Sequence, residues 1–412
     1  MSKAFTLACC CEFQEGYVNP TQKEPRYFGG NIKWLRASDL NDGYVFNTER
    51  LLSEVGYKSA GKSAKMFEKE TLAISKSGTI GSLGILKERM CGNRAVINIR
   101  VDSDLADLMY VFYTLKYKKS ELIGRAGGSI QKNLYVSALE TLALNHQILS
   151  EQREIAAVLS TLDAKIACNN RINAELEAMA RTLYNYWFVQ FDFPDTNGKP
   201  YRSSGGKMVY NPTLKREIPA GWKDSNIQAV ADLLGGGTPT KKNPEYWNGS
   251  IPFFTPTDAD GSIFKFATAD YITEEGLKGS STKLFGRNTV FITARGSVGR
   301  LVLAGIDMAM NQSCYALRAK SGISHTYLFF LAKELIHHLQ VKSSGSVFDS
   351  IVSNDIELTN LAIPKSDVIE KYAVAVEPAF ERIASNTKEN QHLTQLRDWL
   401  LPMLMNGQVT VA

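Results

Sequence analysis

Two long segments of the chain carry apolar side chains at alternating spacings of four and three residues. In the first segment the spaced positions are Ile155, Leu159, Leu162, Ile166, Asn169, Asn173, Leu176, Ala180, Leu183 and Trp187. In the second they are Tyr372, Val376, Ala379, Ile383, Asn386, Asn390, Leu393, Arg397, Leu400 and Leu404. A 4-3 spacing places such side chains on one face of a helix. The pattern predicts two long helices, over residues 149–190 and 367–412, whose apolar faces pair with each other.

Each apolar face is interrupted at its middle by two asparagines, Asn169 and Asn173 in the first helix and Asn386 and Asn390 in the second. Antiparallel packing would superimpose the two midpoints, so we predict that Asn169 faces Asn390 and that Asn173 faces Asn386. Buried amides would fix the register, because a shifted helix would leave them unpaired against leucine. The alternative is that the four amides lie on a solvated flank. Pro378 lacks a backbone donor, which predicts a kinked or frayed segment before it.

The rest of the chain has a different sequence pattern, with short apolar runs separated by Gly, Pro and aromatic residues. Residues 1–148 and 221–366 both show this pattern, which predicts mixed domains built from many short strands. A connector rich in Gly, Pro and Ser, over residues 191–220, precedes the second domain. The expected fold class is α+β: two globular mixed α/β domains separated by a pair of long antiparallel helices.

The two mixed segments are copies of one another. Ser75–Gly81 (SKSGTIG) recurs as Thr293–Gly299 (TARGSVG), with an offset of 218 residues from Gly78 to Gly296. Further landmarks keep nearly the same offset: Pro20 and Pro239, Asp39 and Asp258, Asn93 and Asn311, Gly128 and Gly345, and Asn169 and Asn386. Chance would supply one such pair but not an ordered series. The chain is therefore interpreted as a diverged tandem duplication with pseudo-twofold organisation.

Composition narrows the class of protein only slightly. The sequence has 47 Lys and Arg against 42 Asp and Glu, a net charge of +5, which permits a nucleic-acid partner without requiring one. No apolar stretch approaches the roughly 18 residues of a membrane span, and we see no signal peptide. Three of the six cysteines, Cys9–Cys11, are contiguous, and no C-x-x-C pair occurs. We therefore expect reduced thiols in a cytoplasmic protein and no metal site.

Several motifs resemble those of the specificity subunits of type I restriction enzymes. The similar stretches are Glu151–Leu159 (EQREIAAVL), Leu162–Ile166 (LDAKI), Gly198–Gly206 (GKPYRSSGG), Ile218–Trp222 (IPAGW) and Leu400–Gly407 (LLPMLMNG). The resemblance extends over nearly the whole chain. It departs from the family pattern at the start, because no tryptophan corresponding to Trp222 opens the first half.

The resemblance implies a non-catalytic subunit with two target-recognition domains, residues 1–148 and 221–366, each reading one half of a split, asymmetric site in double-stranded DNA. It implies that the helices space these domains and dock two methyltransferase subunits, and that restriction (translocase) subunits join the complex. S-adenosylmethionine, ATP and magnesium would be held by those partner subunits, and this chain would hold no cofactor.

The first candidate for DNA contact is a series of lysines. Lys58, Lys62, Lys65 and Lys69 are spaced by four, three and four residues. This spacing predicts one face of a helix, which would neutralise phosphates and make binding salt-dependent. The alternative is an ordinary solvated helix face.

The loop from Arg125 to Asn133 is a sharper candidate, because its glycines let the backbone approach DNA closely. Gln131 and Asn133 have the amide geometry that reads adenine, while Arg125 and Lys132 suit guanine or phosphate.

The corresponding loop of the second half, residues 342–349, keeps the Gly-Ser pair and changes the other side chains. Its candidate contacts are Lys342, Ser346 and Phe348. Two different half-sites would require such a change, and neutral drift in a loop would also produce it. Further candidate contacts in the two halves are Lys76, Ser77, Lys241, Lys242 and Arg295.

Two other classes of function stay open at this point. Gly56–Ser63 (GYKSAGKS) matches the pattern of a phosphate-binding loop and suggests a nucleotide-binding enzyme. Such a loop needs a buried strand before it and a helix after it, whereas the preceding residues (NTERLLSEV) indicate a charged helix or an irregular segment. The second alternative is a protein scaffold that does not bind DNA. The long helices suit a scaffold, and the recognition-type domains argue against it.

Overall fold

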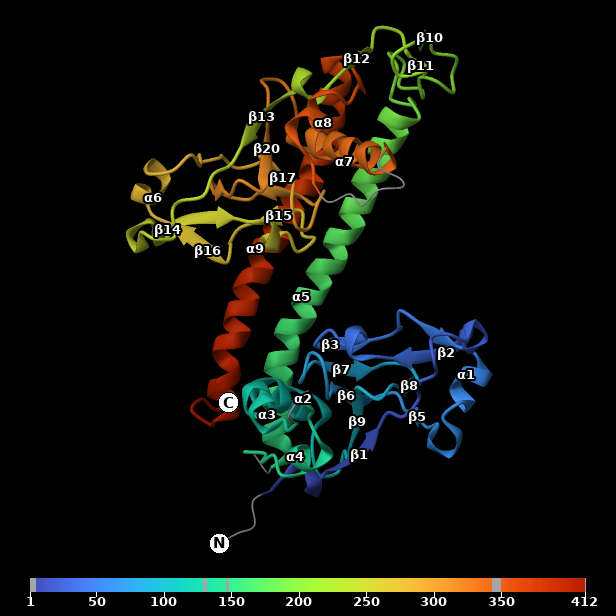
Figure 1. The fold of residues 1–412 in the computed structure, drawn as a ribbon, viewed down its shortest axis with the longest axis vertical. Helices are drawn as coiled ribbons and strands as arrows, with labels where there is room; N and C mark the ends of the chain where they lie inside the picture. Colours follow the sequence, from blue (N-terminus) through green and yellow to red (C-terminus); the bar gives the residue numbers. More distant parts are fainter. Residues whose placement is uncertain (1–4, 129–131, 146–147, 343–349, 412) are drawn as a thin grey trace. The chain divides into compact units, whose positions relative to one another are not determined.

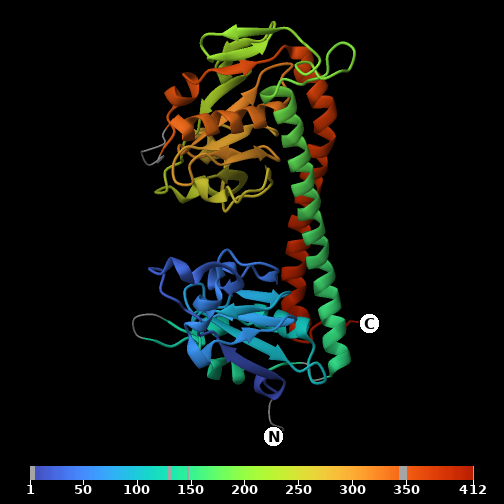
Figure 2. The same cartoon turned by 90° about the vertical axis from the view of Figure 1, so that its right-hand side faces the viewer.

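The computed structural model describes residues 5–128, 132–145, 148–342 and 350–411 (Figure 1). The chain forms two compact units. Unit 1 comprises Met1–Ile166 and His392–Ala412, and unit 2 comprises Ala167–Gln391. Each unit combines sheets with one part of each of two long helices, α5 (Leu149–Tyr184) and α9 (Ser366–Met405) (Figure 2). The predicted fold class, mixed α/β domains with a pair of long antiparallel helices, is confirmed.

The described residues of unit 1 form two sheets. The first has the strand order β1-β9-β6-β7-β3, with the bounds β1 (Cys11–Glu15), β3 (Gly43–Val45), β6 (Thr71–Ser75), β7 (Leu83–Leu86) and β9 (Val96–Val101). The second has the order β4-β2-β8-β5, with the bounds β2 (Phe28–Leu35), β4 (Leu51–Leu52), β5 (Met66–Phe67) and β8 (Met90–Gly92). Every residue of β6 is buried, which is typical of a strand covered on both faces.

The core of unit 1 joins the first sheet to helices. The short helices are α1 (Glu54–Lys58), α2 (Leu108–Tyr117), α3 (Lys119–Arg125) and α4 (Val136–Glu140). The middle of α2, from Tyr110 to Leu115, is buried. It packs with Leu72 and Ile97 of the sheet and with Leu159 and Leu404 of the long helices in one apolar cluster. The long helices are therefore part of the domain core.

Unit 2 repeats this topology. Its first sheet has the order β13-β20-β17-β18-β15, with the bounds β13 (Ala231–Gly235), β15 (Phe264–Lys265), β17 (Val290–Thr293), β18 (Leu301–Ala304) and β20 (Cys314–Ala319). Its second has the order β16-β14-β19, with the bounds β14 (Trp247–Phe254), β16 (Asp270–Ile272) and β19 (Ala309–Met310). In both units the first sheet has three antiparallel pairings and one parallel pairing, in the same order. The structure thus supports the tandem duplication.

Unit 2 also has elements of its own. They are the hairpin β10 (Met208–Asn211) and β11 (Arg216–Pro219) and the pair β12 (Lys223–Ser225) and β21 (Leu361–Ile363). Its short helices repeat those of unit 1: α6 (Glu274–Lys278) corresponds to α1, α7 (His325–Lys342) to α2 with α3, and α8 (Ser353–Glu357) to α4. Near the start of unit 1, the isolated bridge between Thr6 and Ala143 lies where unit 2 has the β12–β21 pair. The first half, which lacks a counterpart of Trp222, thus opens with a weaker pairing.

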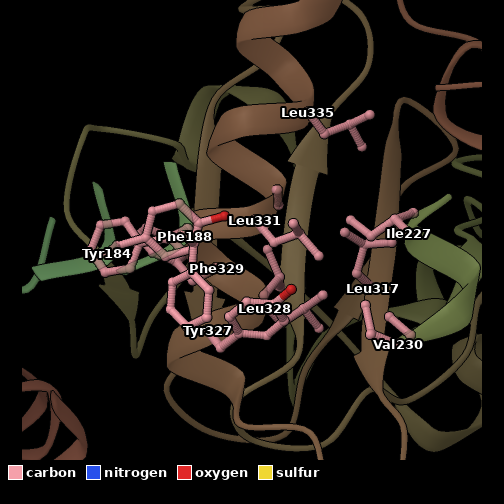
Figure 3. Close-up of a cluster of buried hydrophobic side chains, with 14 of the residues drawn as sticks. Tyr184, Phe188, Ile227, Val230, Leu317, Tyr327, Leu328, Phe329, Leu331 and Leu335 are labelled. Atoms are coloured by element: carbon pink, nitrogen blue, oxygen red, sulfur yellow. The ribbon is translucent and has the colours of Figure 1, made fainter. Parts of the chain in front are cut away.

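An aromatic cluster attaches the end of α5 to the sheet domain of unit 2 (Figure 3). After Tyr184 the helix continues for one π-helical turn, Asn185–Val189. Phe188 in this turn lies 4.9 Å from Tyr327 and 5.1 Å from Tyr372, measured between ring centroids. Tyr184 lies 5.5 Å from Phe330 of α7. Aromatic pairs at these separations stabilise a core beyond the area that they bury.

A layer of amides joins α5 to α9 within unit 2. The Asn169 side chain donates to Asn390 at 2.9 Å, and the Asn386 side chain donates to Asn173 at 2.9 Å. Asn169 is fully buried and Asn386 is 1% exposed. Both predicted facing pairs are present, and the alternative of a solvated flank is wrong for Asn169 and Asn386.

An ionic contact joins the same helices within unit 1. Arg397 of α9 donates to the Asp163 carboxylate of α5 at 2.7 Å. The Tyr113 hydroxyl of α2 donates to the other oxygen of Asp163, also at 2.7 Å. Arg397 occupies a position of the apolar face, and Asp163 neutralises its charge there.

Helix α9 passes through Pro378 without interruption, since it runs from Ser366 to Met405. The expectation that the segment before Pro378 is frayed is therefore wrong. The buried side chains Tyr372, Val376 and Phe380 hold the flanking turns against the core. Packing of an apolar face supplies most of the stability of a helix in a protein, so one missing backbone donor does not end this one.

Candidate nucleic-acid interface

The four lysines of the predicted helical stripe do not share a helix. Helix α1 ends at Lys58, Lys62 lies in a 3-10 turn (Gly61–Ser63), and Lys65 and Lys69 flank the short strand β5. The prediction of one helical face is wrong. Its physical cause is Gly61, whose φ of +58° is left-handed and interrupts a helix. All four lysines are exposed, so each remains an individual candidate for phosphate contact.

The phosphate-loop pattern also has the wrong surroundings. Gly56 lies inside α1, where its amide donates to the N-cap Ser53 at 3.1 Å. Lys62 and Ser63 are followed by β5, whereas a phosphate loop requires a helix whose first amides point at the phosphates. The structure therefore does not support nucleotide binding at Gly56–Ser63.

The loop that follows α3 in unit 1 is closed at its base. The backbones of Gly127 and Asn133 exchange two hydrogen bonds, at 3.0 and 2.8 Å. Lys132 is exposed, and Gln131 lies outside the described residues. Arg125 donates to Thr141 at 2.9 Å and forms an ion pair with Glu121. The Arg125 side chain therefore makes its contacts within unit 1, with α3 and with the residue that follows α4.

The corresponding loop of unit 2, after α7, meets the rest of its unit through a different bridge. Lys342 ends α7 and is exposed, and Ser346 and Phe348 lie outside the described residues. Where the chain is described again, Ser350 bridges Arg295 and the Ile351 amide donates to Ala294 at 2.9 Å. The loop therefore returns to the turn after β17.

Lys241 and Lys242 lie in a different part of unit 2. Both are exposed in the turn before the 3-10 turn Pro244–Tyr246, and the Lys241 ammonium lies 5.8 Å from the Trp247 ring centroid.

Unit 1 has an open cavity of about 520 Å³ beside the predicted loop residues. Its lining includes Lys76, Ser77 and Asn133, which the sequence singled out. Residues missed by the sequence analysis complete it: Gly16, Tyr17, Asn19, Asn93, Arg94, Ala95 and Tyr135. Tyr17 and Tyr135 are 47% and 50% exposed, so two aromatic rings line a cavity that also holds charged and amide side chains.

Charge at this cavity is organised around one carboxylate. Glu15 accepts from the Lys76 ammonium at 2.9 Å and from the Tyr17 hydroxyl at 3.0 Å. The Lys76 ammonium holds the pKa of Glu15 below its usual range, and the bond to Glu15 raises the pKa of the Tyr17 hydroxyl. Lys76 and Tyr17 are thereby positioned, while the Arg94 side chain is exposed beside them.

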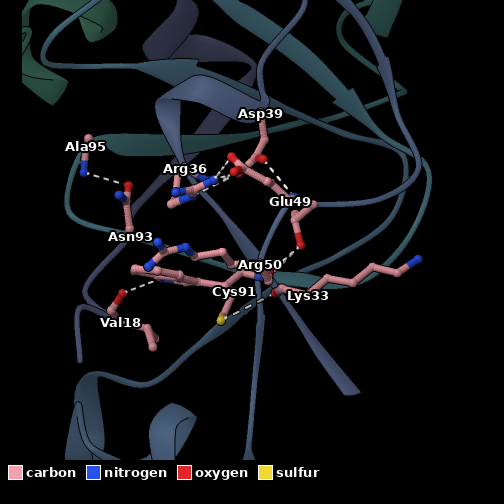
Figure 4. Close-up of polar contacts among 11 residues, drawn as sticks. Val18, Lys33, Arg36, Asp39, Glu49, Arg50, Cys91, Asn93 and Ala95 are labelled. Carbon is pink, nitrogen blue, oxygen red and sulfur yellow. Dashed lines mark hydrogen bonds and ion pairs between the residues drawn. The ribbon is translucent and has the colours of Figure 1, made fainter. Parts of the chain in front are cut away.

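Side chains that cap backbone amides fix two turns of unit 1, one at Asn93 and one at Asp39 (Figure 4). Asn93 accepts from the Ala95 amide at 2.9 Å. Asp39 accepts from the amides of Arg36 and Glu49, at 2.8 and 3.0 Å. Asn311 and Asp258, the repeat partners of Asn93 and Asp39, cap amides in the same way in unit 2. These repeated residues are structural. Asn93 was also the signal that could have directed attention to Arg94, the next residue.

Other kinds of site find little support in the described part of the chain. Within it, no helix is both long and apolar enough to cross a bilayer. Among the same residues, no group of three or more His, Cys, Asp and Glu side chains could hold a metal ion. The six cysteines are free thiols, three of them buried.

Comparison with known proteins agrees with the repeated architecture. The model of the type I restriction modification DNA specificity domain matches residues 3–178 and again residues 219–395. The chain is 26% identical over 404 residues to the type I restriction enzyme MjaIX specificity subunit of Methanocaldococcus jannaschii, covering 96% of this chain and 91% of that protein. It is 23% identical over 347 residues to the HindI specificity subunit of Haemophilus influenzae, covering 72% and 75%.

A solved structure shows the same fold. The type I restriction-modification system S subunit from M. genitalium aligns with a TM-score of 0.59 and 15% identity, covering 98% of this chain and 95% of that one. The family model matches both halves of the chain, and the two matched segments together cover most of the sequence. The protein therefore belongs to the family of type I restriction–modification DNA specificity subunits.

Proposed function

We propose that this chain selects the DNA sequence on which a type I restriction–modification complex acts. Residues 1–148 and 221–366 are its two target-recognition domains, and each reads one half of a bipartite, asymmetric site in double-stranded DNA. The protein is itself non-catalytic and works in the cytoplasm. Methyltransferase and restriction subunits hold S-adenosylmethionine, ATP and magnesium and perform the chemistry.

One observation carries this proposal: the two halves share a backbone and differ in the side chains that line its exposed turns. Asn93 and Asn311 cap equivalent turns, whereas their neighbours are Arg94 and Gln312. Arginine pairs with guanine and glutamine with adenine through two hydrogen bonds in the major groove. A shared scaffold with different polar side chains is what an asymmetric, two-part DNA site requires.

Exchange of one domain tests the proposal. Residues 1–148 are replaced by the corresponding segment of a homologous specificity subunit, and the methylated sites are mapped across a genome with the partner subunits present. We expect one half of the methylated sequence to change and the other half to stay the same, because each domain reads its half independently. Replacement of residues 221–366 is the reciprocal control.

The scaffold alternative makes the opposite prediction. A scaffold without DNA reading would support methylation at unchanged sites after either exchange. That result would refute the proposed function.

The partner subunits need a surface on the long helices, and unit 2 has an apolar one. A groove of about 470 Å³ is lined by Met179, Leu183, Tyr186, Ala375 and Val376, among others. Met179 is 53% exposed and Tyr186 is 37% exposed. Large apolar side chains exposed together mark interaction sites, so we assign this groove to one methyltransferase subunit.

The helical repeat places a second surface of this kind in unit 1. Met179 and Thr182 have counterparts 217 positions later in Leu396 and Trp399. Leu396 is 43% exposed and Trp399 is 57% exposed. We assign this face to the second methyltransferase subunit, so the duplication supplies two docking faces as well as two reading domains.

Single substitutions on the two faces should remove one methyltransferase each. Trp399→Ala and Tyr186→Ala each delete an exposed aromatic anchor, and we expect at least about a tenfold loss of affinity at that face, since buried interface aromatics are worth 1.4 kcal/mol or more. Native mass spectrometry should show a complex with a single methyltransferase for each variant. Gln395→Ala, at an exposed polar position on the same helix as Trp399, is the matched control. Full occupancy in both aromatic variants would show that the faces are assigned wrongly.

A further inference from the structure

The turn that follows β6 in unit 1 and the turn that follows β17 in unit 2 are built by the same hydrogen bonds. The amide of Lys76 donates to Ala95, and that of Ala294 donates to Ser313, both at 2.8 Å. The backbone carbonyl oxygen of Lys76 accepts from the Leu134 amide at 2.8 Å, and that of Ala294 accepts from the Ile351 amide at 2.9 Å. These bonds make the alignment of the two turns structural, so side chains can be compared position by position.

The strand that borders the turn is also equivalent in both units. A Cβ added to Gly16 would lie 2.1 Å from the Asn93 oxygen, and one added to Gly236 would lie 2.2 Å from the Asn311 oxygen. The next backbone hydrogen bond found in both units is donated by the Val18 amide to the Gly92 carbonyl in unit 1 and by the Gly237 amide to the Met310 carbonyl in unit 2. One residue separates Gly16 from Val18, but none separates Gly236 from Gly237. Tyr17 is therefore an insertion that only unit 1 has.

On this common backbone, five positions carry different side chains in the two units. The unit 1 residue and its unit 2 counterpart are Lys76 and Ala294, Ser77 and Arg295, Arg94 and Gln312, Asn133 and Ser350, and Tyr135 and Val352. We call these the reading positions. All of their side chains except that of Ala294 are exposed or half-buried. Unit 1 thus has cations at Lys76 and Arg94, whereas unit 2 has its cation at Arg295. The amide side chain is Asn133 in unit 1 and Gln312 in unit 2, and the aromatic Tyr135 has no aromatic counterpart.

The differences are correlated, which argues against simple drift. Lys76 is paired with Glu15 at 2.9 Å, and unit 2 has Ala294 and Gly235 at these two positions, so both partners of the ion pair have changed together. Gln312 is hydrogen-bonded to Thr238, whose counterpart is Asn19, a residue that lines the unit 1 cavity beside Arg94. Each unit therefore has a polar contact of its own at these turns, Lys76 with Glu15 in unit 1 and Gln312 with Thr238 in unit 2.

We propose that the reading positions are the residues that distinguish the two half-sites, with Arg94 and Tyr135 as specificity-determining residues of unit 1. This inference rests on the proposed function and assigns its specificity to particular side chains. Arg94 has the two donors that read guanine, and the Asn133 amide has the donor and acceptor that read adenine. In unit 2, Arg295 and Gln312 have the corresponding groups at other positions. Tyr17 and Tyr135 add aromatic surface that unit 2 lacks at these positions.

A graft within the chain tests the inference. Unit 1 receives the unit 2 side chains through Lys76→Ala, Ser77→Arg, Arg94→Gln, Asn133→Ser and Tyr135→Val, together with Glu15→Gly to remove the unpaired carboxylate. The full chain is expressed with its partner subunits, and methylated sites are mapped. We expect the half-site read by unit 1 to become the half-site read by unit 2, which would convert an asymmetric site into a symmetric one.

Single variants keep the test decisive if the graft does not fold. Arg94→Gln alters one exposed side chain, and we expect it to shift base preference at one position of one half-site by about tenfold, from guanine towards adenine. Arg89→Gln, an identical change at an exposed arginine paired with Glu68 outside the cavity, is the matched control and should leave base preference as it is.

The outcomes separate the inference from the function on which it rests. Unchanged base preference in Arg94→Gln, with the wild-type sites still methylated in sequence-specific fashion, would overturn the assignment of the reading positions alone. Absence of any sequence-specific methylation that depends on the wild-type chain would overturn the proposed function and this inference with it.

Discussion

Phe188→Ala is expected to lower the free energy of unfolding of unit 2 by about 3–5 kcal/mol, the cost of removing a buried phenyl ring that its neighbours cannot replace. Phe188 is 3% exposed. Its ring centroid lies 5.0, 4.9 and 5.1 Å from those of Tyr184, Tyr327 and Tyr372, which come from α5, α7 and α9. Alanine would leave a cavity where these three helices meet.

The consequence should be local to the contact between helix and domain. Hydrogen exchange of the amides of α7 and β17 reports the opening free energy of this region. Tyr210→Ala removes an aromatic side chain that is 62% exposed on the β10–β11 hairpin, so we expect it to cost less than about 0.5 kcal/mol. Equal effects of the two substitutions would show that the cluster does not hold α5 to the domain.

Asn386→Leu is expected to destabilise the helix pair of unit 2 by about 1–3 kcal/mol, because the half-buried Asn173 oxygen would lose the donor that now lies 2.9 Å away. Asn386 itself is 1% exposed, so the leucine would lie in the buried layer and direct its apolar side chain at that oxygen. The double variant Asn173→Leu, Asn386→Leu removes both polar groups. We expect it to recover most of the loss, since replacing both partners by apolar groups is nearly neutral.

Chemical denaturation of the three variants, with hydrogen exchange of α9, measures this contrast. The control is Asn170→Ala, which removes the exposed acceptor of Asn390 at 2.8 Å and should cost less than about 0.5 kcal/mol. If the single variant were as stable as this control, the amide layer would not contribute to the specificity of helix pairing. If the double variant were the least stable, the hydrogen bond itself would outweigh the cost of burying the amides.

Several residues that sequence reasoning identified are structural. The repeated pairs Asn93 and Asn311, and Asp39 and Asp258, cap backbone amides. Repetition therefore marked the residues that build the backbone, whereas the positions that we propose to read DNA are those at which the halves differ. A search for similarity between the halves could not find Arg94 or Tyr135, because neither is repeated.

The lysine series shows how a spacing can mislead. Intervals of four and three residues predict a helix face only where the chain is helical, and Gly61 with its φ of +58° interrupts the helix between Lys58 and Lys65. The spacing in the long helices was reliable because it continued through ten positions, and the 36 and 40 residues of α5 and α9 followed it.

The two long helices, the facing of Asn169 and Asn173 on Asn390 and Asn386, the duplication and the family could all be predicted from the amino-acid sequence. Each of these appears as a period or a repeat along the chain, and the apolar face of a helix depends only on residues three and four positions apart. The cavity of unit 1 could not be predicted and is known from the folded structure. Its lining comes from segments near Gly16, Lys76, Arg94 and Asn133, which strand pairing brings together although they lie far apart in the chain. No local sequence pattern predicts that these segments become neighbours, because their positions follow from the register of the whole sheet.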